Sequence, residues 1–193
     1  MALTNLMEFK KEVASETLEI VQDNVELIKY VILKQLSTNP RHVLKRKKNK
    51  LLLHRFGVAI DQASKITGTP WEEIVMTSFC ESTFRGVKTK GDAGEVGLMQ
   101  LHRKAPWTHC EEQLNRPVDR HSIEDQYICG GFWLKKRKEE CDGSIKQGSA
   151  KYMTGSTCKP EQGGRLWHAI RHRMGILKEV RKYINTFKKE KQK

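Results

Sequence analysis

The chain has 193 residues and 37% hydrophobic content, which is enough for one globular domain with a packed core. Its formal net charge of +13 favours a polyanionic partner: nucleic acid, an anionic membrane or an anionic polymer of a bacterial wall. No run of about 18 apolar residues occurs, so no transmembrane helix is expected. The N-terminus also lacks the basic-then-apolar pattern of a signal peptide.

Residues 5–37 are predicted to form one long amphipathic helix, because apolar residues recur at alternating steps of four and three. They are Ala14, Leu18, Val21, Val25, Ile28 and Ile32. Residues 1–37 contain six acidic and four basic side chains, so the rest of the chain carries +15. The apolar stripe must be covered. Packing on the domain's own core is favoured, and a coiled-coil contact with another chain is the alternative.

Asn39-Pro40 ends this pattern, and a second helix is predicted over 45–66. A helix over 71–82 follows, with Thr69 as its N-cap and Pro70 as its first helical residue. Residues 85–97 form a loop. A further helix is expected to begin near Met99 and to be stopped by Pro106.

The remaining segments continue this helical pattern. Residues 108–121 are expected to be irregular, and a helix over 122–140 begins with Ser122 as its cap. Residues 142–164 combine a short helix with Gly-rich loop, and a terminal helix covers 167–187. The fold class is therefore mainly α, with room for a small β-hairpin in the Gly-rich loop. The chain divides into an N-terminal helical extension (1–40), a helical domain (41–187) and a frayed basic tail (188–193).

The five cysteines leave at least one thiol free. Cys80 lies inside the apolar helix 71–82 and is expected to be a small buried hydrophobe. Cys141 and Cys158 flank a loop-rich stretch and can pair if the protein reaches an oxidising compartment. No cysteine or histidine spacing indicates zinc, and neither a metal nor any other cofactor is expected.

Glu81 closes the apolar run from Trp71 to Cys80. Desolvation at the mouth of an apolar pocket disfavours a charged carboxylate, and a glycosidic oxygen needs a protonated acid in order to leave. The Gly-rich stretch 91–97 could let the backbone approach a sugar closely. Together these features indicate carbohydrate cleavage.

Four motifs in order resemble those of the soluble lytic transglycosylase catalytic domain, a relative of goose-type lysozyme. Glu81-Ser82-Thr83-Phe84 matches Glu-Ser-x-Phe. Residues 91–100 match Ser-x-x-Gly-Ala-x-Gly-Leu-Met-Gln, with Gly91 for Ser and Glu95 for Ala. The third motif, Asn-x-x-x-Gly-x-x-aromatic-Leu, is matched at 126–134 with Gln126 for Asn. The fourth, Ala-Tyr-Asn-x-Gly, is matched at 151–155 with Met153 for Asn.

The resemblance covers about residues 60–175 and implies a lysozyme-like fold and cleavage of peptidoglycan between N-acetylmuramic acid and N-acetylglucosamine. It implies that Glu81 protonates the leaving oxygen and then takes the proton of the C6 hydroxyl, so that a 1,6-anhydro ring forms. The substrate's own N-acetyl group would stabilise the intermediate. The residues that the resemblance assigns to substrate binding are Ser82, Gly97, Leu98, Met99, Gln100 and Tyr152.

Each assignment has a structural alternative. Glu81 could be a helix-end carboxylate paired with a basic side chain, and Ser82 could cap the helix locally instead of bonding to Glu81. Gln100 either binds a sugar or is a polar residue at a helix start. Met99 either floors a sugar subsite or belongs to the core, and Tyr152 either orients Glu81 or is a core tyrosine.

Two further carboxylates decide between two chemistries. Glu95 or Asp92 could hold a water molecule in the cleft, which would make the protein a hydrolase of the goose-type lysozyme kind. The alternative for each is an exposed, solvated loop acid. A third possibility is a catalytically weak module that binds the wall or serves in a virion, with helix 5–37 used for self-association.

The expected partner is the peptidoglycan glycan strand, with anionic wall polymers as further candidates. A specific nucleic-acid interaction is not expected, because no aromatic residues are interleaved with the basic runs. The protein is expected to be made in the cytoplasm and to act at the bacterial cell wall or in the periplasm, delivered as a phage endolysin or virion component. An antimicrobial, wall-degrading action follows from this interpretation.

Overall fold

The computed structural model describes residues 22–37, 39, 42–45, 49–91, 94–102 and 104–192. Within these ranges the chain is mainly helical and contains no strand, as the sequence predicts. None of the described helices is long and apolar enough to cross a membrane. The coarse prediction of a mainly α protein is therefore confirmed.

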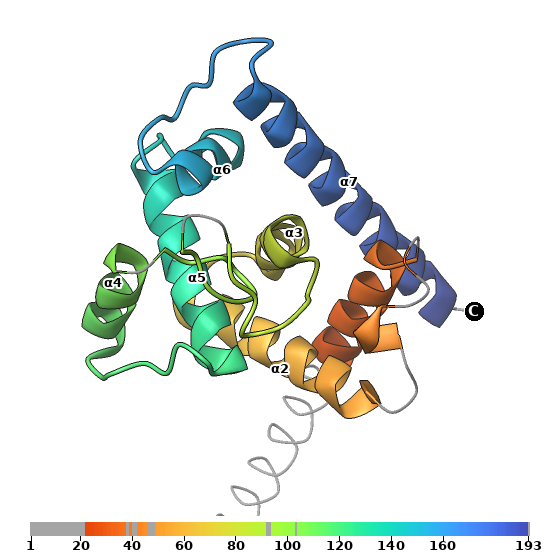
Figure 1. The fold of residues 1–193 in the computed structure, drawn as a ribbon. Coiled ribbons are helices and arrows are strands. Elements are labelled where there is room, and N and C mark those ends of the chain that lie inside the picture. The colour runs from red at the N-terminus through yellow and green to blue at the C-terminus, as the bar shows by residue number, and fades with distance from the viewer. Residues whose placement is uncertain are drawn as a thin grey trace, which may run out of the picture.

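Residues 22–35 form the described part of the predicted N-terminal helix. Its stripe residues Val25, Ile28 and Ile32 are buried, and the last two belong to the main hydrophobic core. The helix also lies beside the C-terminal end of the chain, where Tyr30 and Phe187 bring their ring centroids within 5.1 Å (Figure 1). Over this stretch the stripe packs on the domain's own core. Ala14, Leu18 and Val21, which would extend it, lie outside the described residues.

A central helix organises the fold. Helix α5 (Ile123–Glu139) packs against α2 (Lys50–Thr67), α4 (Ala105–Leu114) and α6 (Ile145–Thr154). Ser122 caps α5 as predicted, since its hydroxyl accepts a hydrogen bond from the Asp125 amide at 3.3 Å. A short 3-10 turn, η1 (Val43–Lys45), precedes α2, so α2 begins later than the predicted residue 45.

Two other helices, α3 (Trp71–Ser82) and α7 (Arg165–Lys191), pack against each other, and α3 also contacts α2 and α5. Helix α3 has the predicted bounds, and α7 runs along one side of the molecule (Figure 1). The predicted cap of α3 is wrong. Thr69 uses its hydroxyl in a 2.9 Å hydrogen bond to the Gly131 carbonyl, and Pro70 occupies the cap position. Helix α7 also continues through most of the basic tail that was expected to be frayed.

The prediction of a helix that begins near Met99 and stops at Pro106, followed by an irregular segment over 108–121, is wrong. Residues 97–100 form a turn, and the helix begins at Ala105 and contains Pro106 in its first turn. Proline is compatible with this position because the first amide groups of a helix have no partner within the helix. The expected hairpin is reduced to two isolated antiparallel bridges, Lys90 with Val96 and Val96 with Leu101.

Two disulfides connect these elements. Cys110–Cys129 joins α4 to α5, and Cys141–Cys158 joins the end of α5 to the loop between α6 and α7. The second is the pair suggested by the sequence, whereas the first was not predicted. Cys80 keeps a free thiol.

We expect the two disulfides to open at different reductant concentrations. Cys110 and Cys129 are fully buried, whereas Cys158 is only partly buried, so a reductant reaches Cys141–Cys158 without unfolding the domain. Loss of a loop closure of this size costs about 2–4 kcal/mol of stability. Graded reduction, thiol alkylation and mass spectrometry should label Cys141 and Cys158 first, with a lowered melting temperature. Simultaneous labelling of all four cysteines would contradict this order.

Candidate active site

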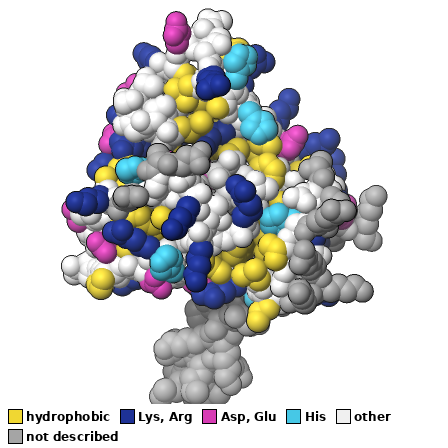
Figure 2. Space-filling view, in the orientation of Figure 1, with side chains coloured by type: hydrophobic (Ala, Val, Ile, Leu, Met, Phe, Trp, Pro, Cys, Tyr) yellow, Lys and Arg dark blue, Asp and Glu magenta, His cyan; other side chains and the backbone are white. Residues whose placement is uncertain are grey.

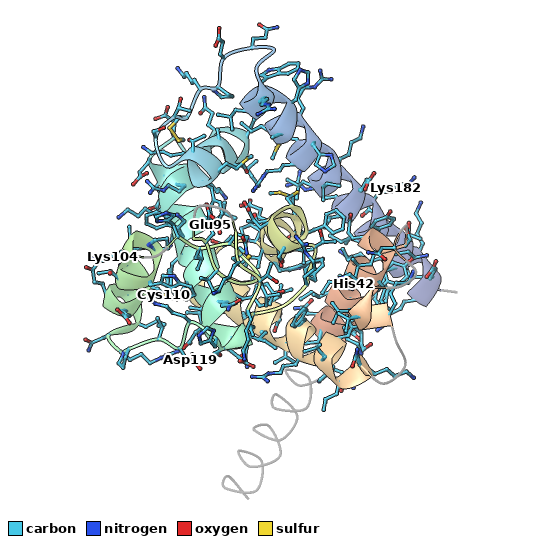
Figure 3. All side chains as sticks on the ribbon, in the orientation of Figure 1. His42, Glu95, Lys104, Cys110, Asp119 and Lys182 are labelled. Atoms are coloured by element: carbon cyan, nitrogen blue, oxygen red, sulfur yellow. A yellow bond between two sulfur atoms is a disulfide. The ribbon has the colours of Figure 1, made fainter. Side chains whose placement is uncertain are left out.

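A cleft of about 740 Å³ lies between α3, the loop that precedes α4, α5 and the end of α6. Glu81, in the last turn of α3, is at one wall. Figure 3 labels Glu95 on the Gly-rich loop, which contributes a second carboxylate to the same cleft. The remaining lining residues are Gln100, Leu101, His102, Ala105, Pro106, Trp133, Arg137, Tyr152, Met153, Thr154 and Gly155.

Glu81 is paired with a buried arginine. Nη2 of Arg173 in α7 donates a hydrogen bond to Oε1 of Glu81, and the exposed fractions of the two side chains are 4% and 18%. Nη1 of Arg173 is buried and has no hydrogen-bond partner among the described residues. The sequence alone suggested an apolar pocket around Glu81. The structure instead gives this carboxylate a charged partner from a helix 92 residues further along the chain.

The neighbouring titratable groups keep their protons. Burial raises the pKa of the Cys80 thiol to about 11, which the charge of Arg173 opposes and that of Glu81 reinforces. Burial raises the pKa of Tyr152 well above its usual 10, and the negative charge of Glu81 adds to the rise. Burial would lower the pKa of Arg173, but Glu81 and other neighbours outweigh it and raise that pKa. At neutral pH, Cys80 and Tyr152 are therefore neutral beside the Glu81–Arg173 pair.

Ser82 holds the Gly-rich loop to α3. Its hydroxyl lies 3.1 Å from the Ser78 carbonyl and 2.9 Å from the Leu98 carbonyl, and it is fully buried. The hydroxyl of Ser78 also reaches Leu98, at 3.2 Å. The expected hydrogen bond from Ser82 to Glu81 is absent from the described contacts. Ser82 thus follows the alternative of local bonding and, in addition, positions the loop.

Gln126 fixes the same residue, Leu98, from the side of α5. Its Oε1 accepts from the Leu98 amide at 2.8 Å, and its Nε2 donates to the carbonyls of Val87 and Arg120 at 2.9 and 2.6 Å. Gly97, at φ +87°, lies so close that a Cβ atom there would be 2.2 Å from Oε1 of Gln126. Glycine is required at this position by the approach of Gln126, and not, as the sequence suggested, by the approach of a sugar.

Leu98 and Met99 do not line the cleft. Both side chains are fully buried in the core, and Met99 packs against Gly130 of α5 so closely that a Cβ atom there would be 2.6 Å away. The predicted contact of these two side chains with substrate is therefore not supported by their position. Met99 is therefore a core residue, which was the alternative for it. The backbone carbonyls of Leu98 and Met99 accept hydrogen bonds from Ser82 and Tyr152.

Gln100 and Tyr152 do line the cleft. Nε2 of Gln100 donates to the carbonyls of Gly97 and Thr89 at 2.7 and 3.2 Å. The Tyr152 hydroxyl donates to the Met99 carbonyl at 2.7 Å. The Gln100 bonds close the loop on itself, and the Tyr152 bond ties the loop to α6. One face of each side chain is left toward the cleft.

Two departures from the family motif prove to be linked. A Cβ atom at Gly91 would lie 2.4 Å from Oε2 of Glu95 and 2.6 Å from Oε1 of Gln100. The space that the serine of the family motif would fill is occupied by the ends of these two side chains. A larger residue at 91 would require the ends of the Glu95 and Gln100 side chains to move. Asp92, the other candidate carboxylate, lies outside the described residues.

The turn that follows Glu81 has an unusual backbone. Thr83 and Phe84 adopt φ values of +52° and +55°, which cost energy in non-glycine residues. His42 supports this turn: its Nδ1 accepts from the Leu44 amide at 3.2 Å, so its Nε2 carries the proton that is donated to the Thr83 carbonyl at 2.7 Å. A neutral imidazole is thus built into the wall behind α3.

We expect His42 to make stability depend on pH. Burial lowers the pKa of His42 below 6.5, partly offset by the bond to Thr83, while Lys45 lowers it further. The unfolded chain then binds the proton more readily, so the stability is present above pH 6.5 and is lost as pH falls through and below that value. The melting temperature of His42→Gln should fall less than that of wild type between neutral pH and about pH 5. His121→Gln, at an exposed site, is the control, and an unchanged pH dependence in His42→Gln would contradict the prediction.

The tryptophans and histidines divide between core and surface. Trp107 is fully buried, and Trp133 is nearly so but reaches the cleft, where the Arg137 guanidinium lies 3.9 Å from its ring centroid. Trp167 lines a separate hollow with Lys159 and Pro160. No group of three or more histidine, cysteine or acidic side chains among the described residues is arranged to hold a metal ion.

Sequence reasoning missed Arg173, although a signal was present. The buried residues of α7 include Ile170, Leu177 and Val180, and Arg173 falls on the same helical face. A basic residue on an otherwise apolar helix face needs a buried partner.

No protein-family model matches this chain, and no curated protein matches it. The functional interpretation therefore depends on the motifs and on the cleft itself.

Proposed function

We propose that the protein is a peptidoglycan lytic transglycosylase that cleaves glycan strands in the cleft at Glu81. The observation that carries the proposal is that one cleft, built by Ser82, Gln126 and Tyr152 around the Gly-rich loop, joins Glu81 to the second and fourth motifs. A hollow of this size can take sugar units of a glycan strand, and its wall carries a carboxylate within reach of the solvent.

In the proposed reaction Glu81 gives a proton to the glycosidic oxygen as the bond from that oxygen to C1 breaks. The N-acetyl oxygen of the same sugar stabilises C1. The C6 hydroxyl then attacks C1 and returns its proton to Glu81, so that the carboxyl group is restored and a 1,6-anhydro ring is formed. Water is not consumed, and a single carboxylate is sufficient.

The second candidate is hydrolysis of the same bond, as in goose-type lysozyme. It is favoured by the position of Glu95, whose carboxylate lies in the same cleft as Glu81. A carboxylate facing the proton donor across the sugar can activate water, and the product is then a reducing end. The two chemistries use the same substrate and differ in the second nucleophile.

Two further observations support action at the wall. Two disulfides are typical of proteins that work in an oxidising compartment. The net charge of +13 favours association with an anionic wall, and Figure 2 shows Lys and Arg side chains spread across one face of the molecule. Delivery by a phage, as an endolysin or a virion component, is the route we propose.

The products of purified peptidoglycan test this proposal. Mass spectrometry should find muropeptide ends that are one water lighter than the hydrolytic product and resist borohydride reduction. Reducing ends would favour the hydrolase and assign the water to Glu95. Absence of any product, with retained binding to peptidoglycan, would overturn the enzymatic proposal and leave a wall-binding or virion module. The Glu81→Gln protein is the matched control for contaminating activity.

A further inference from the structure

The strongest unexplained feature of the molecule is the buried arginine behind Glu81. Arg173 is not among the residues that line the cleft, so it lies behind the carboxylate and cannot be a direct ligand of the glycan. Its residue exposure is 3%, and the only carboxylate to which the described contacts join it is Glu81. Burial of a guanidinium is costly unless a partner compensates its charge. A purely apolar residue would fill this face of α7 at lower cost.

We infer that Arg173 is a positioning residue for Glu81: it pairs with the ionised carboxylate in the resting protein, holds it toward the cleft, and compensates the same negative charge when Glu81, after taking up a proton from solvent, gives that proton to the leaving oxygen. This inference rests on the proposed function, because it assigns Arg173 a part in that reaction. When Glu81 protonates the leaving oxygen, its own carboxyl group becomes anionic. A fixed guanidinium beside it stabilises that charge without any rearrangement of solvent.

The geometry of the guanidinium fits this role. Nη2 already donates to Oε1 of Glu81, while Nη1 is a buried donor without a partner among the described residues. A small movement of the side chain would let this unused donor form a second hydrogen bond to the carboxylate, in the bidentate arrangement that guanidinium groups favour. An orphaned buried donor is otherwise an unexplained cost.

Among the described contacts, Arg173 is the cation paired with Glu81, whereas Arg137, which also lines the cleft, pairs with Glu140. The Cys80 thiol and the Tyr152 hydroxyl are the other titratable groups that share electrostatic contact with Glu81 and Arg173, and neither carries a positive charge. Tyr152 gives its hydroxyl proton to the Met99 carbonyl, so this bond does not orient Glu81. Orientation of Glu81 from behind therefore depends on Arg173.

Three variants test the inference with a soluble glycan substrate. Arg173→Met removes the charge and keeps an unbranched apolar stem, and Arg173→Lys keeps the charge without the planar fork. Lys182→Met is the control at an exposed position on the same helix (Figure 3). We expect kcat to fall about a hundredfold in Arg173→Met, with KM changed little. Arg173→Lys should recover part of kcat, and Lys182→Met should match wild type. Rates are compared per folded molecule, with the folded fraction taken from near-ultraviolet circular dichroism.

An unchanged kcat in folded Arg173→Met, with an active wild type, would overturn the inference alone. Failure of wild type to release products would overturn the proposed function and this catalytic role together. Should Arg173→Met not fold, the double variant Glu81→Gln with Arg173→Met and the Arg173→Lys protein take its place. If Arg173 is an unpaired buried charge in Glu81→Gln, removal of that charge in the double variant should raise the melting temperature. A double variant that melts no higher than Glu81→Gln, together with wild-type kcat in Arg173→Lys, would overturn the role of the guanidinium.

Discussion

Replacement of Glu81 by Gln is expected to slow the cleavage of peptidoglycan by about 10²–10⁴-fold, the range found for the loss of a general acid. Glutamine keeps the size of the side chain and can still accept a hydrogen bond from Arg173, but it has no proton to give to a departing oxygen. Product release from purified sacculi, followed by mass spectrometry, measures the rate.

The same substitution also leaves the charge of Arg173 buried without an anion, so Glu81→Gln should melt at a lower temperature than wild type. The rate must therefore be compared below the onset of melting. Glu72→Gln, on the same helix but outside the cleft, is the matched control and should keep both rate and stability. A Glu81→Gln protein with the wild-type rate would remove Glu81 from the mechanism.

Replacement of Gln126 by Leu is expected to lower the free energy of unfolding by about 4 kcal/mol. The side chain is fully buried, and its loss leaves the Leu98 amide and the carbonyls of Val87 and Arg120 without their partner. Leucine fills a similar volume, so the cost comes from the unpaired polar groups and not from a cavity. Urea unfolding of both proteins measures it.

The change should also reach the cleft. Because Gln126 accepts from the Leu98 amide, its loss leaves the loop that carries Glu95 and Gln100 held by Ser78, Ser82 and Tyr152 among the described side-chain contacts. Hydrogen exchange of the amides in residues 94–102 should become faster in Gln126→Leu than in an exposed control, Gln113→Leu. Unchanged exchange in that loop would show that Ser78, Ser82 and Tyr152 suffice to hold it.

Local patterns predicted most of the helices, because each pattern depends on neighbours in sequence. The bounds of α3 and the Ser122 cap of α5 follow from an apolar run and a capping hydroxyl. The prediction failed at α4, where Pro106 was interpreted as a helix stop and is part of the helix start. A proline is compatible with the end of one helix and with the first turn of the next. The two cases differ in whether the amide groups that follow the proline are hydrogen-bonded within a helix.

Some of the residues predicted for the site line one cleft, whereas Ser82, Leu98 and Met99 are buried outside it. The motif order brought Glu81, Gln100 and Tyr152 to one cleft, and the sequence offered Glu95 as a second carboxylate there. The Arg173 pair depends on how α7 crosses α3, which no local pattern encodes. Likewise the Cys110–Cys129 disulfide depends on α4 being a helix that lies along α5, and so it was missed together with that helix.

The attachment of α7 has a consequence for the integrity of the chain. The segment that leads into it is exposed at Glu161, and both disulfides close before that residue. If the chain were cut there, the described contacts that retain α7 would all be non-covalent: packing against α3, α6 and the helix at 22–35, and the ion pairs of Arg173 with Glu81 and of Lys191 with Asp23. The pairing of Arg173 with Glu81 would then depend on the association of two fragments. The fraction of molecules that contain this pair, which is fixed in the intact chain, would vary with the concentration of the cleaved protein.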